Sequence, residues 1–388
     1  MPIKIPDSLP ARAVLEGEQI FVMTEHRAQH QDIRPLELLL LNLMPNKINT
    51  EIQYLRMLSN SPLQVNVRLL RIDYHLSRHT PQEHLDTFYV GFEEVRERYY
   101  DGMIVTGAPL DQKSFDVVNY WENLAEIIRW SSTHVTSTLF SCWGVAAALK
   151  IFYGAPMVER QDKLSGVFLQ HTAPLSDTLI RGFDDSFLAP ISRFIDFTPK
   201  YIKSYTELEI LASGDESGVY LAISRDRRQV YVTGHPEYDA HTLADEYHRD
   251  LKAGRAPVLP QNYFPHDDPS AHHGQDGAPF ELSPRKGGMG APGIELRRIH
   301  SPIQFRVEDG EVGGVSHGKR ARVGKAENPR GLRRHFGNEQ RQVDFSRVVQ
   351  VGQQHAQRRL QSRKSTGRQS VLLVLFFLGM GGMVGDDC

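Results

Sequence analysis

The feature that most constrains this chain is an abrupt change of sequence pattern around Cys142. Residues 135–140, Val-Thr-Ser-Thr-Leu-Phe, are β-branched and apolar and predict a strand. Ser141-Cys142-Trp143-Gly144 interrupts this run, and an alanine-rich segment to Leu149 predicts a helix that begins at once. A strand, a tight turn holding a nucleophilic residue, and a helix form the nucleophile-elbow pattern. We therefore expect Cys142 at the carboxyl end of a strand in an α/β sheet.

The predicted surroundings of Cys142 favour a reactive thiolate. The free N–H groups and the positive dipole end of the following helix point toward the sulfur, and the thiolate is the nucleophilic form of cysteine. A buried and inert cysteine is an equally good interpretation of Cys142 by itself, because free cysteine is among the most buried residue types. The decision depends on whether the chain supplies a base.

The elements around Cys142 alternate between strands and helices. Strands are predicted at 36–43, 63–72, 101–106 and 229–234, and helices at 50–58 with Thr50 as N-cap, 81–94, 115–130 and 242–253. Shorter strands between Lys163 and Ile223 predict an antiparallel extension or a rim that covers one end of the sheet. This alternation predicts a doubly wound, mostly parallel α/β sheet, whose ligands bind at the carboxyl ends of the strands.

Composition excludes several classes of partner and site. The chain has 388 residues and a net charge of −2, so no strong field indicates nucleic acid or an acidic membrane. Its two cysteines, Cys142 and Cys388, form no disulfide framework, and no signal segment opens the chain, so we expect the cytoplasm. A metal site is not expected, because one Cys and one His do not complete the usual ligand sets.

The sequence changes character after about residue 270. Tyr263 is the last tyrosine, no tryptophan follows it, and arginine, glycine and glutamine dominate without lasting periodicity. Such a chain buries too little apolar surface to offset its ordering entropy. We therefore expect a catalytic domain over residues 1–270 and a disordered or non-native tail over 271–388. A membrane or interaction role of the apolar run at 371–378, which is short for a span, is the minor alternative.

A strand ending in Gly234-His235-Pro236-Glu237 supplies the base that Cys142 needs. A cysteine nucleophile uses an imidazole base, and a carboxylate holds the tautomer of that imidazole. On an extended backbone His235 and Glu237 point to the same side, since side chains alternate with period two. Cys142, His235 and Glu237 are therefore the predicted catalytic triad, with three unrelated residues at strand ends as the competing interpretation.

These motifs resemble the class I glutamine amidotransferase-like superfamily, and within it the homoserine O-acyltransferases of methionine biosynthesis. The stretches that carry the resemblance are Met1-Pro2-Ile3, Asn42 to Lys47, Leu58 to Gln64, Val105 to Pro109, Lys163 to Val167, Gly182 to Phe187, Thr233 to Tyr238 and Asn262 to Pro269. The likeness spans residues 1 to about 270 and implies a glutamine amidotransferase-like, flavodoxin-like fold.

The resemblance implies a ping-pong acyl transfer. Cys142 would take an acyl group from acyl-CoA as a thioester, and the hydroxyl of L-homoserine would remove it, with His235 as general base and acid and Glu237 orienting it. The backbone N–H of Trp143 is predicted to stabilise the oxyanion, and by the resemblance Lys47 shares that task. No cofactor is implied, since acyl-CoA is a co-substrate, and a homodimer stays open.

By family position Lys163, Ser192 and Arg249 would contact the amino-acid substrate. An arginine binds a carboxylate through two hydrogen bonds, and a hydroxyl suits a polar group. Without the resemblance, each of the three would be interpreted as a solvated surface residue.

Asp111 occupies the family position that distinguishes acyl donors, where the resemblance links glutamate to acetyl-CoA and glycine to succinyl-CoA. Its carboxylate should repel the free carboxylate of a succinyl group, which favours acetyl-CoA slightly. Aspartate is shorter than glutamate, however, and several flanking stretches resemble the succinyl type, so succinyl-CoA remains the second choice.

Two further interpretations stay open. A glutamine amidotransferase-like amidohydrolase would use the same Cys-His-Glu triad, and an interaction protein would carry a relic triad.

After Asp268-Pro269 the chain lacks the family's Arg-Trp-x-Ser-His-Gly type segment and closing aromatic-rich helix. This abrupt departure indicates a reading-frame change, so we expect residues 271–388 to be its product.

Overall fold

The computed structural model describes residues 3–6, 8–18, 20, 22–23, 34–59, 64–72, 80–174, 177, 179–180 and 183–270, which belong to one structural unit. The strands are β1 (Ile3–Lys4), β2 (Val22–Met23), β3 (Leu36–Leu41), β4 (Val65–Leu70), β5 (Tyr89–Val90), β6 (Tyr100–Val105), β7 (Val135–Ser141), β8 (Glu159–Thr172), β9 (Ser186–Ile195), β10 (Glu209–Gly214), β11 (Gly218–Ile223) and β12 (Gln229–Val232). The helices are α1 (Pro10–Gly17), α3 (Lys47–Ser59), α4 (Gln82–Phe88), α5 (Trp121–His134), α6 (Trp143–Tyr153), α7 (Pro199–Tyr205) and α8 (Thr242–Lys252). Short 3₁₀ turns lie at Phe92–Glu94, Phe115–Val117 and Pro265–Asp267.

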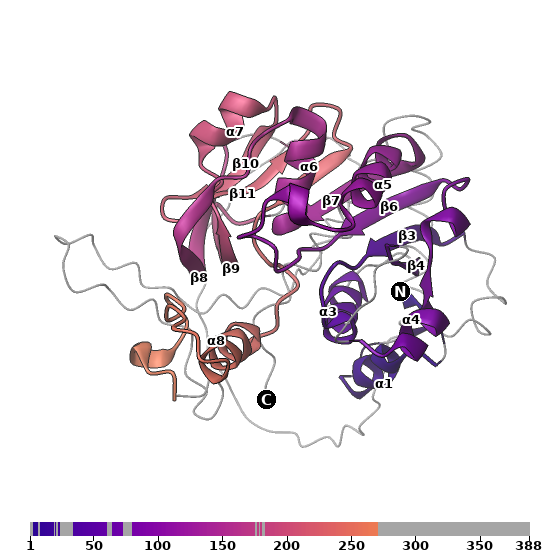
Figure 1. The fold of residues 1–388 in the computed structure, drawn as a ribbon, viewed down its shortest axis with the longest axis horizontal. Coiled ribbons are helices and arrows are strands. Elements are labelled where there is room, and N and C mark those ends of the chain that lie inside the picture. The colour runs from indigo at the N-terminus through magenta and orange to yellow at the C-terminus, as the bar shows by residue number, and fades with distance from the viewer. Residues whose placement is uncertain are drawn as a thin grey trace, which may run out of the picture. The chain divides into compact units, whose positions relative to one another are not determined.

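In this part of the chain the strands form a single mixed sheet (Figure 1). Its order is β2-β1-β4-β3-β6-β7-β12-β11-β10-β8-β9, and β5 pairs with β4 outside this path. Pairing is parallel from β2 to β12 and antiparallel from β12 to β9. The predicted doubly wound, mostly parallel α/β sheet with an antiparallel extension is confirmed.

The leucine-rich strand β3 shows how both faces of the sheet are covered. Leu38 and Leu40 are buried in the core that includes the apolar residues of α1 and α3. Leu39 and Leu41 are buried in a second core with α5 and α6. Because successive side chains of a strand point to opposite faces, a nearly continuous apolar run is what a strand buried on both faces requires.

Helix α3 begins at Lys47, earlier than predicted, and Thr50 is not its N-cap. Thr50 lies inside the first turn, where its backbone N–H and its hydroxyl both donate to the carbonyl of Asn46, at 3.4 and 3.1 Å. Asn46 instead occupies the position before the helix, and its side-chain oxygen accepts from the N–H of Asn49 at 3.5 Å. The prediction for Thr50 was wrong because asparagine is preferred over threonine as an N-cap residue, and Asn46 precedes the helix.

Two predicted helices differ from the observed ones. The helix predicted over 81–94 is confined to α4, because Tyr89 and Val90 leave it to pair as β5 with β4. The helix predicted over 115–130 begins only at Trp121, and residues 115–117 form a 3₁₀ turn before it.

Strand β9 was not predicted from the sequence. Pro190 lies within it, and proline, which has no N–H to donate, is tolerated at the edge of a sheet, where β9 is the last strand. The carbonyl of Pro190 accepts a hydrogen bond from the N–H of His235 at 3.0 Å. An edge strand therefore contributes directly to the position of His235.

Helix α8 is held near the antiparallel strands by the segment that follows it. The N–H of Gln261 donates to Ser165 at 2.8 Å, and the N–H of Val167 donates to Gln261 at 2.9 Å. Gly166 between them has φ +145°, and a Cβ there would lie 2.2 Å from the carbonyl oxygen of Gln261. This close pairing requires glycine. The predicted tail over 271–388 lies outside the described residues.

Candidate active site

Cys142 lies in the strand-to-helix turn that its sequence pattern predicts. Strand β7 ends at Ser141, α6 begins at Trp143, and Cys142 between them has φ 49° and ψ −115°. Non-glycine residues rarely adopt a positive φ, and such strain occurs often at functional sites. Gly144 permits the tight turn, since a Cβ there would lie 2.9 Å from the carbonyl oxygen of Thr106. The nucleophile-elbow geometry is therefore confirmed.

His235 and Glu237 form a buried hydrogen-bonded pair. The Nδ1 atom of His235 lies 2.8 Å from Oε1 of Glu237, and the two side chains are each 5% exposed. Strand β12 ends at Val232, however, and a turn closed by the N–H of Tyr238 on the carbonyl of His235, at 3.2 Å, brings the two side chains together. The predicted pairing exists, but a turn produces it, and the period-two argument from an extended strand was wrong.

The imidazole of His235 also lies beside Cys142: both residues border Gly107, and their charges interact. Burial lowers the pKa of His235, but the negative charges of Cys142 and Glu237 raise it, and the net result is a pKa well above 6.5. Gly107 packs against the pair: a Cβ there would lie 3.2 Å from Cβ of Cys142 and 3.7 Å from Cε1 of His235. Such a site keeps a proton on the imidazole beside a nucleophilic sulfur.

Tyr54 on α3 lies close to this pair and was not singled out by the sequence. Among the described residues neither its hydroxyl nor Oε2 of Glu237 has a hydrogen-bond partner, and both atoms are buried. Burial, and then the charge of Glu237, raise the pKa of Tyr54 well above its usual value. The hydroxyl therefore remains protonated beside the carboxylate.

Lys163 and Ser192 meet at a carboxylate that sequence reasoning missed, Glu246 of α8. Lys163 Nζ lies 3.0 Å from Oε2 of Glu246, and the hydroxyl of Ser192 donates to the same oxygen at 2.5 Å. Tyr238 donates its hydroxyl to Oε1 at 2.6 Å. Burial raises the pKa of Glu246, but Lys163 and these hydrogen bonds outweigh it and lower the pKa to about 2. Glu246 is thus negatively charged at neutral pH.

The Glu246 cluster is linked to the elbow on two sides. The ring of Tyr238 stacks on the ring of His235, with 4.1 Å between centroids and 18° between planes. The carbonyl of Ser192 lies 3.8 Å from the sulfur of Cys142. Two residues assigned to substrate binding by the resemblance, Lys163 and Ser192, are therefore adjacent to the candidate triad.

Arg249 does not join this cluster. Its guanidinium pairs with the neighbouring carboxylate of Asp250, at 3.0 Å, and its side chain is 62% exposed. Arg249 follows Glu246 by nearly one turn of α8.

Asp111 lies against β9 at the edge of the site. Its Oδ2 accepts from the N–H of Phe194 at 2.8 Å, and its buried Oδ1 has no hydrogen-bond partner among the described residues. Burial raises the pKa of Asp111, while His235 and Lys163 oppose this shift electrostatically. The carboxyl group of Asp111 is therefore close enough to His235 and Lys163 to interact with their charges.

Lys47 begins α3 and is 6% exposed. Its ammonium donates to the carbonyls of Asn42 and Met44, at 2.5 and 3.4 Å. The loop that carries these carbonyls follows β3, and the N–H of Leu43 donates to the side chain of Thr106, next to Gly107, at 2.8 Å. The loop thus lies at the same edge of the sheet as Cys142.

Trp143 is the first residue of α6, and the first N–H groups of a helix have no partner within the helix. Its indole is fully buried and packs 5.9 Å from the ring of Phe115, centroid to centroid.

In the described ranges no group of His, Cys, Asp and Glu side chains is arranged to hold a metal ion. No helix there is long and apolar enough to cross a membrane.

Solved structures to which the chain is similar in fold include two glutamine amidotransferases, one from Thermotoga maritima and one from Methylobacillus flagellatus. The first is 12% identical, with a TM-score of 0.40, and the match covers 57% of this chain and 84% of that one. The second is 12% identical, with a TM-score of 0.39, and the match covers 58% and 80%.

Sequence relatives are much closer. A homoserine O-acetyltransferase of Succinatimonas hippei is 68% identical over 70% of this chain and 90% of its own length. A homoserine O-succinyltransferase of Tolumonas auensis is 59% identical over 70% of this chain and 86% of its own length. The model of the homoserine O-succinyltransferase family matches residues 2–276. The chain therefore belongs to this family of acyltransferases and is a homoserine O-acyltransferase.

Proposed function

We propose that this enzyme transfers an acyl group from acyl-CoA to the hydroxyl of L-homoserine through a thioester on Cys142, as a step of L-methionine biosynthesis in the cytoplasm. The observation that carries this mechanism is the position of His235, which is hydrogen-bonded to Glu237 and lies beside Cys142 where both border Gly107. Nucleophile, base and orienting acid are then side by side, as covalent acyl transfer requires.

In the first half-reaction the sulfur of Cys142 attacks the thioester carbonyl of acyl-CoA. The carbon–sulfur bond to CoA breaks, and the leaving thiolate takes the proton of His235. In the second half-reaction His235 removes the proton of the homoserine hydroxyl, whose oxygen attacks the acyl-enzyme. The sulfur of Cys142 leaves as thiolate beside the reprotonated imidazole. Glu237 holds the imidazole in the orientation that both proton transfers need.

Both steps develop negative charge on the acyl oxygen, and the proposed donors to it are the N–H of Trp143 and the ammonium of Lys47. Trp143 is suited to this because it opens α6 directly after the nucleophile. Lys47 would supply a positive charge from the first residue of α3.

For homoserine we propose Lys163, Ser192 and Arg249 as binding residues. Glu246 fixes the first two through its hydrogen bonds, so they are already oriented before substrate arrives. Arg249 would bind the carboxylate of homoserine, which requires its guanidinium to leave Asp250.

For the acyl donor we favour acetyl-CoA. The free carboxylate of a succinyl group would be repelled by the buried carboxylate of Asp111. A proton shared between the two carboxylates would relieve this repulsion, but taking up that proton costs free energy. The relative at 68% identity carries the name of an acetyltransferase, while those at 59% and 57% carry the name of succinyltransferases.

Product analysis tests this proposal. The protein is incubated with L-homoserine and either acetyl-CoA or succinyl-CoA, and the products are identified by mass spectrometry. We expect O-acetylhomoserine to form faster, and Cys142→Ala to lower the rate by about a thousandfold or more. Glutamine hydrolysis without transfer from either donor would instead support the amidotransferase-like alternative.

The tail is a separate proposal. We infer that residues 271–388 result from a change of reading frame, since their composition departs from that of residues 1–270. Sequencing the gene decides this: another frame beyond codon 270 should encode an Arg-Trp-x-Ser-His-Gly type segment, and its absence would refute the inference.

A further inference from the structure

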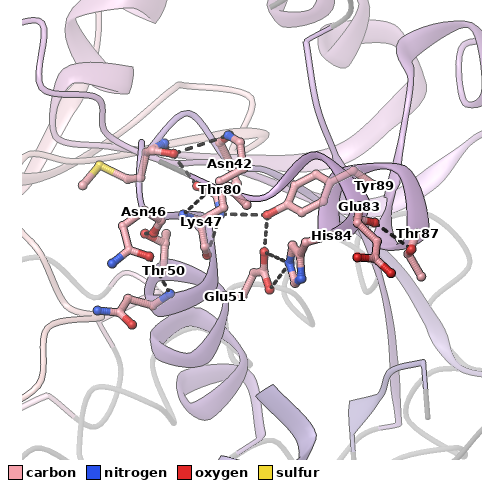
Figure 2. A network of polar contacts seen from close by, with 12 residues as sticks. Asn42, Asn46, Lys47, Thr50, Glu51, Thr80, Glu83, His84, Thr87 and Tyr89 are labelled. Atoms are coloured by element: carbon pink, nitrogen blue, oxygen red, sulfur yellow. Dashed lines mark hydrogen bonds and ion pairs between the residues drawn. The ribbon is translucent and has the colours of Figure 1, made fainter. Parts of the chain in front are cut away.

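Behind Lys47 lies a buried polar network that the proposed mechanism does not use. We call it the Glu51 network, and it consists of Asn42, Lys47, Glu51, His84 and Tyr89 (Figure 2). These residues come from the loop after β3, from α3, from α4 and from β5. All five are buried, and Glu51 is 0% exposed. Such a concentration of polar groups in an apolar core needs a reason.

Glu51 is the centre of the network. Both of its carboxylate oxygens lie near Nε2 of His84, at 3.0 and 3.1 Å, and Oε1 also accepts from the hydroxyl of Tyr89 at 2.5 Å. The ring of His84 packs against Phe88, with 4.9 Å between centroids. Glu51 is therefore fixed from two other elements, α4 and β5, and has little freedom to rotate.

The network reaches Lys47 through Asn42. The side-chain amide of Asn42 donates to the hydroxyl of Tyr89 at 3.0 Å and to the carbonyl of Lys47 at 3.2 Å. The backbone carbonyl of Asn42 in turn accepts from the ammonium of Lys47 at 2.5 Å. Tyr89 thus fixes Asn42. Asn42 in turn is hydrogen-bonded to both the backbone and the side chain of Lys47.

Charge links the same residues. Burial lowers the pKa of Lys47 to about 8, and the carboxylate of Glu51 opposes that shift. Burial raises the pKa of Glu51, while Tyr89, His84 and Lys47 oppose that shift in turn. Lys47 would lose its positive charge at still lower pH if Glu51 were neutral.

Stability alone is a poor reason to keep such a cluster. Buried ion pairs generally stabilise a fold no better than apolar residues of the same size, because both charges must be desolvated. The network does fix a cationic side chain at the edge of the sheet where Cys142 lies.

We propose that Glu51 is a positioning residue for Lys47, keeping its ammonium charged and in place for oxyanion stabilisation, with His84 and Tyr89 fixing Glu51. This inference rests on the proposed role of Lys47 in the acyl transfer. It assigns a part in the chemistry to a second residue of α3, one that touches no substrate.

The test measures CoA release in the first half-reaction, in single turnovers without homoserine, for Glu51→Gln, Lys47→Met and the double variant. If Glu51→Gln lowers the pKa of Lys47 by one unit, acylation should slow by about tenfold above pH 8, where most Lys47 is already uncharged, and by less than about twofold at pH 7. The same substitution should also move the alkaline limb of the pH–rate profile to lower pH, because the protonated fraction of Lys47 falls earlier. Glu83→Gln is the control, since Glu83 is exposed on α4 next to His84 and should behave as wild type.

The double variant separates a positioning role from a structural one. If Glu51 acts through Lys47, adding Glu51→Gln to Lys47→Met costs no further rate, and the double variant keeps the pH profile of Lys47→Met. Losses that multiply, or an unchanged alkaline limb in Glu51→Gln, would overturn the inference. Tyr89→Phe removes one hydrogen bond at nearly constant volume. It should slow acylation less than Glu51→Gln does and move the alkaline limb of the pH–rate profile in the same direction. An unmoved limb in this well-folded variant would also count against the inference.

Failure of the inference and failure of the proposed function give different results. Wild-type protein that releases no CoA from either donor refutes the proposed function. A wild type that releases CoA and a Lys47→Met variant that does so equally fast refute the role of Lys47, and the inference with it. A slow Lys47→Met variant beside a normal Glu51→Gln variant refutes the inference alone.

Discussion

Tyr238 and His235 stack ring on ring, with 4.1 Å between centroids, while the hydroxyl of Tyr238 donates to Glu246 at 2.6 Å. One side chain thus joins the proposed base to the cluster that fixes Lys163 and Ser192. The position of the imidazole and the proposed binding of homoserine are thereby coupled through a single residue.

Tyr238→Phe separates these two contributions. The stacking surface stays, so single-turnover acylation should change little. The hydrogen bond to a charged carboxylate is lost, and KM for homoserine should rise by about tenfold. Steady-state kinetics with each substrate varied will show the split, with Tyr238→Ala as the comparison that also slows acylation. A Tyr238→Phe variant with normal KM and slow acylation would contradict the coupling.

Gly107→Ala should damage the site without damaging the fold elsewhere. The added Cβ would lie 3.2 Å from Cβ of Cys142, tighter than most Cβ contacts, so Cys142 must shift by a few tenths of an ångström beside His235. Overpacking of this kind costs about 1–3 kcal/mol, and acylation should slow by at least about tenfold. Gly17→Ala is the matched control, because nothing lies within 4 Å of the Cβ it adds. Equal activities of the two variants would refute the contact.

Acid stability depends on Glu246. Its pKa is about 2 in the folded protein, against 4.5 for the unperturbed group. The carboxylate therefore stabilises the fold above pH 4.5, and this contribution is lost as the pH falls toward 2. The free energy of unfolding is measured in urea at several pH values. Its decrease at acid pH should be smaller in Glu246→Gln than in wild type by about 2–3 kcal/mol. Identical pH dependence in wild type and variant would show that Glu246 is not the group responsible.

Asp111→Gly tests the proposed choice of donor. Removing the buried carboxylate removes the repulsion of a succinyl group, so kcat/KM with succinyl-CoA should rise by about tenfold relative to acetyl-CoA. Asp111→Asn keeps the size of the side chain and should shift the ratio in the same direction by less. An unchanged ratio in both variants would place the specificity elsewhere in the chain.

Much of the site could be predicted because its residues lie at the ends of strands whose patterns are local. The turn at Cys142 follows from a β-branched run that meets an alanine-rich one, and the structure has it there. His235 and Glu237 were paired correctly for a wrong reason, since the turn that joins them depends on Tyr238.

The rest depends on contacts between distant segments. Glu246 lies on an amphipathic helix whose place is set by Gln261 pairing beside Gly166, 95 residues away in sequence, and no local pattern encodes that pairing. Strand β9 was missed because Pro190 argues against a strand unless the strand lies at a sheet edge. Edge position is a property of the assembled sheet.

The thioester itself is the most direct test of the mechanism. The full-length protein is mixed with acetyl-CoA without homoserine, and its intact mass and peptide map are measured within seconds and again after homoserine is added. We expect one added acetyl group, located on Cys142, absent in Cys142→Ala and removed by homoserine as O-acetylhomoserine appears. Product formation without an acyl group ever appearing on Cys142, or at an unchanged rate in Cys142→Ala, would contradict the mechanism.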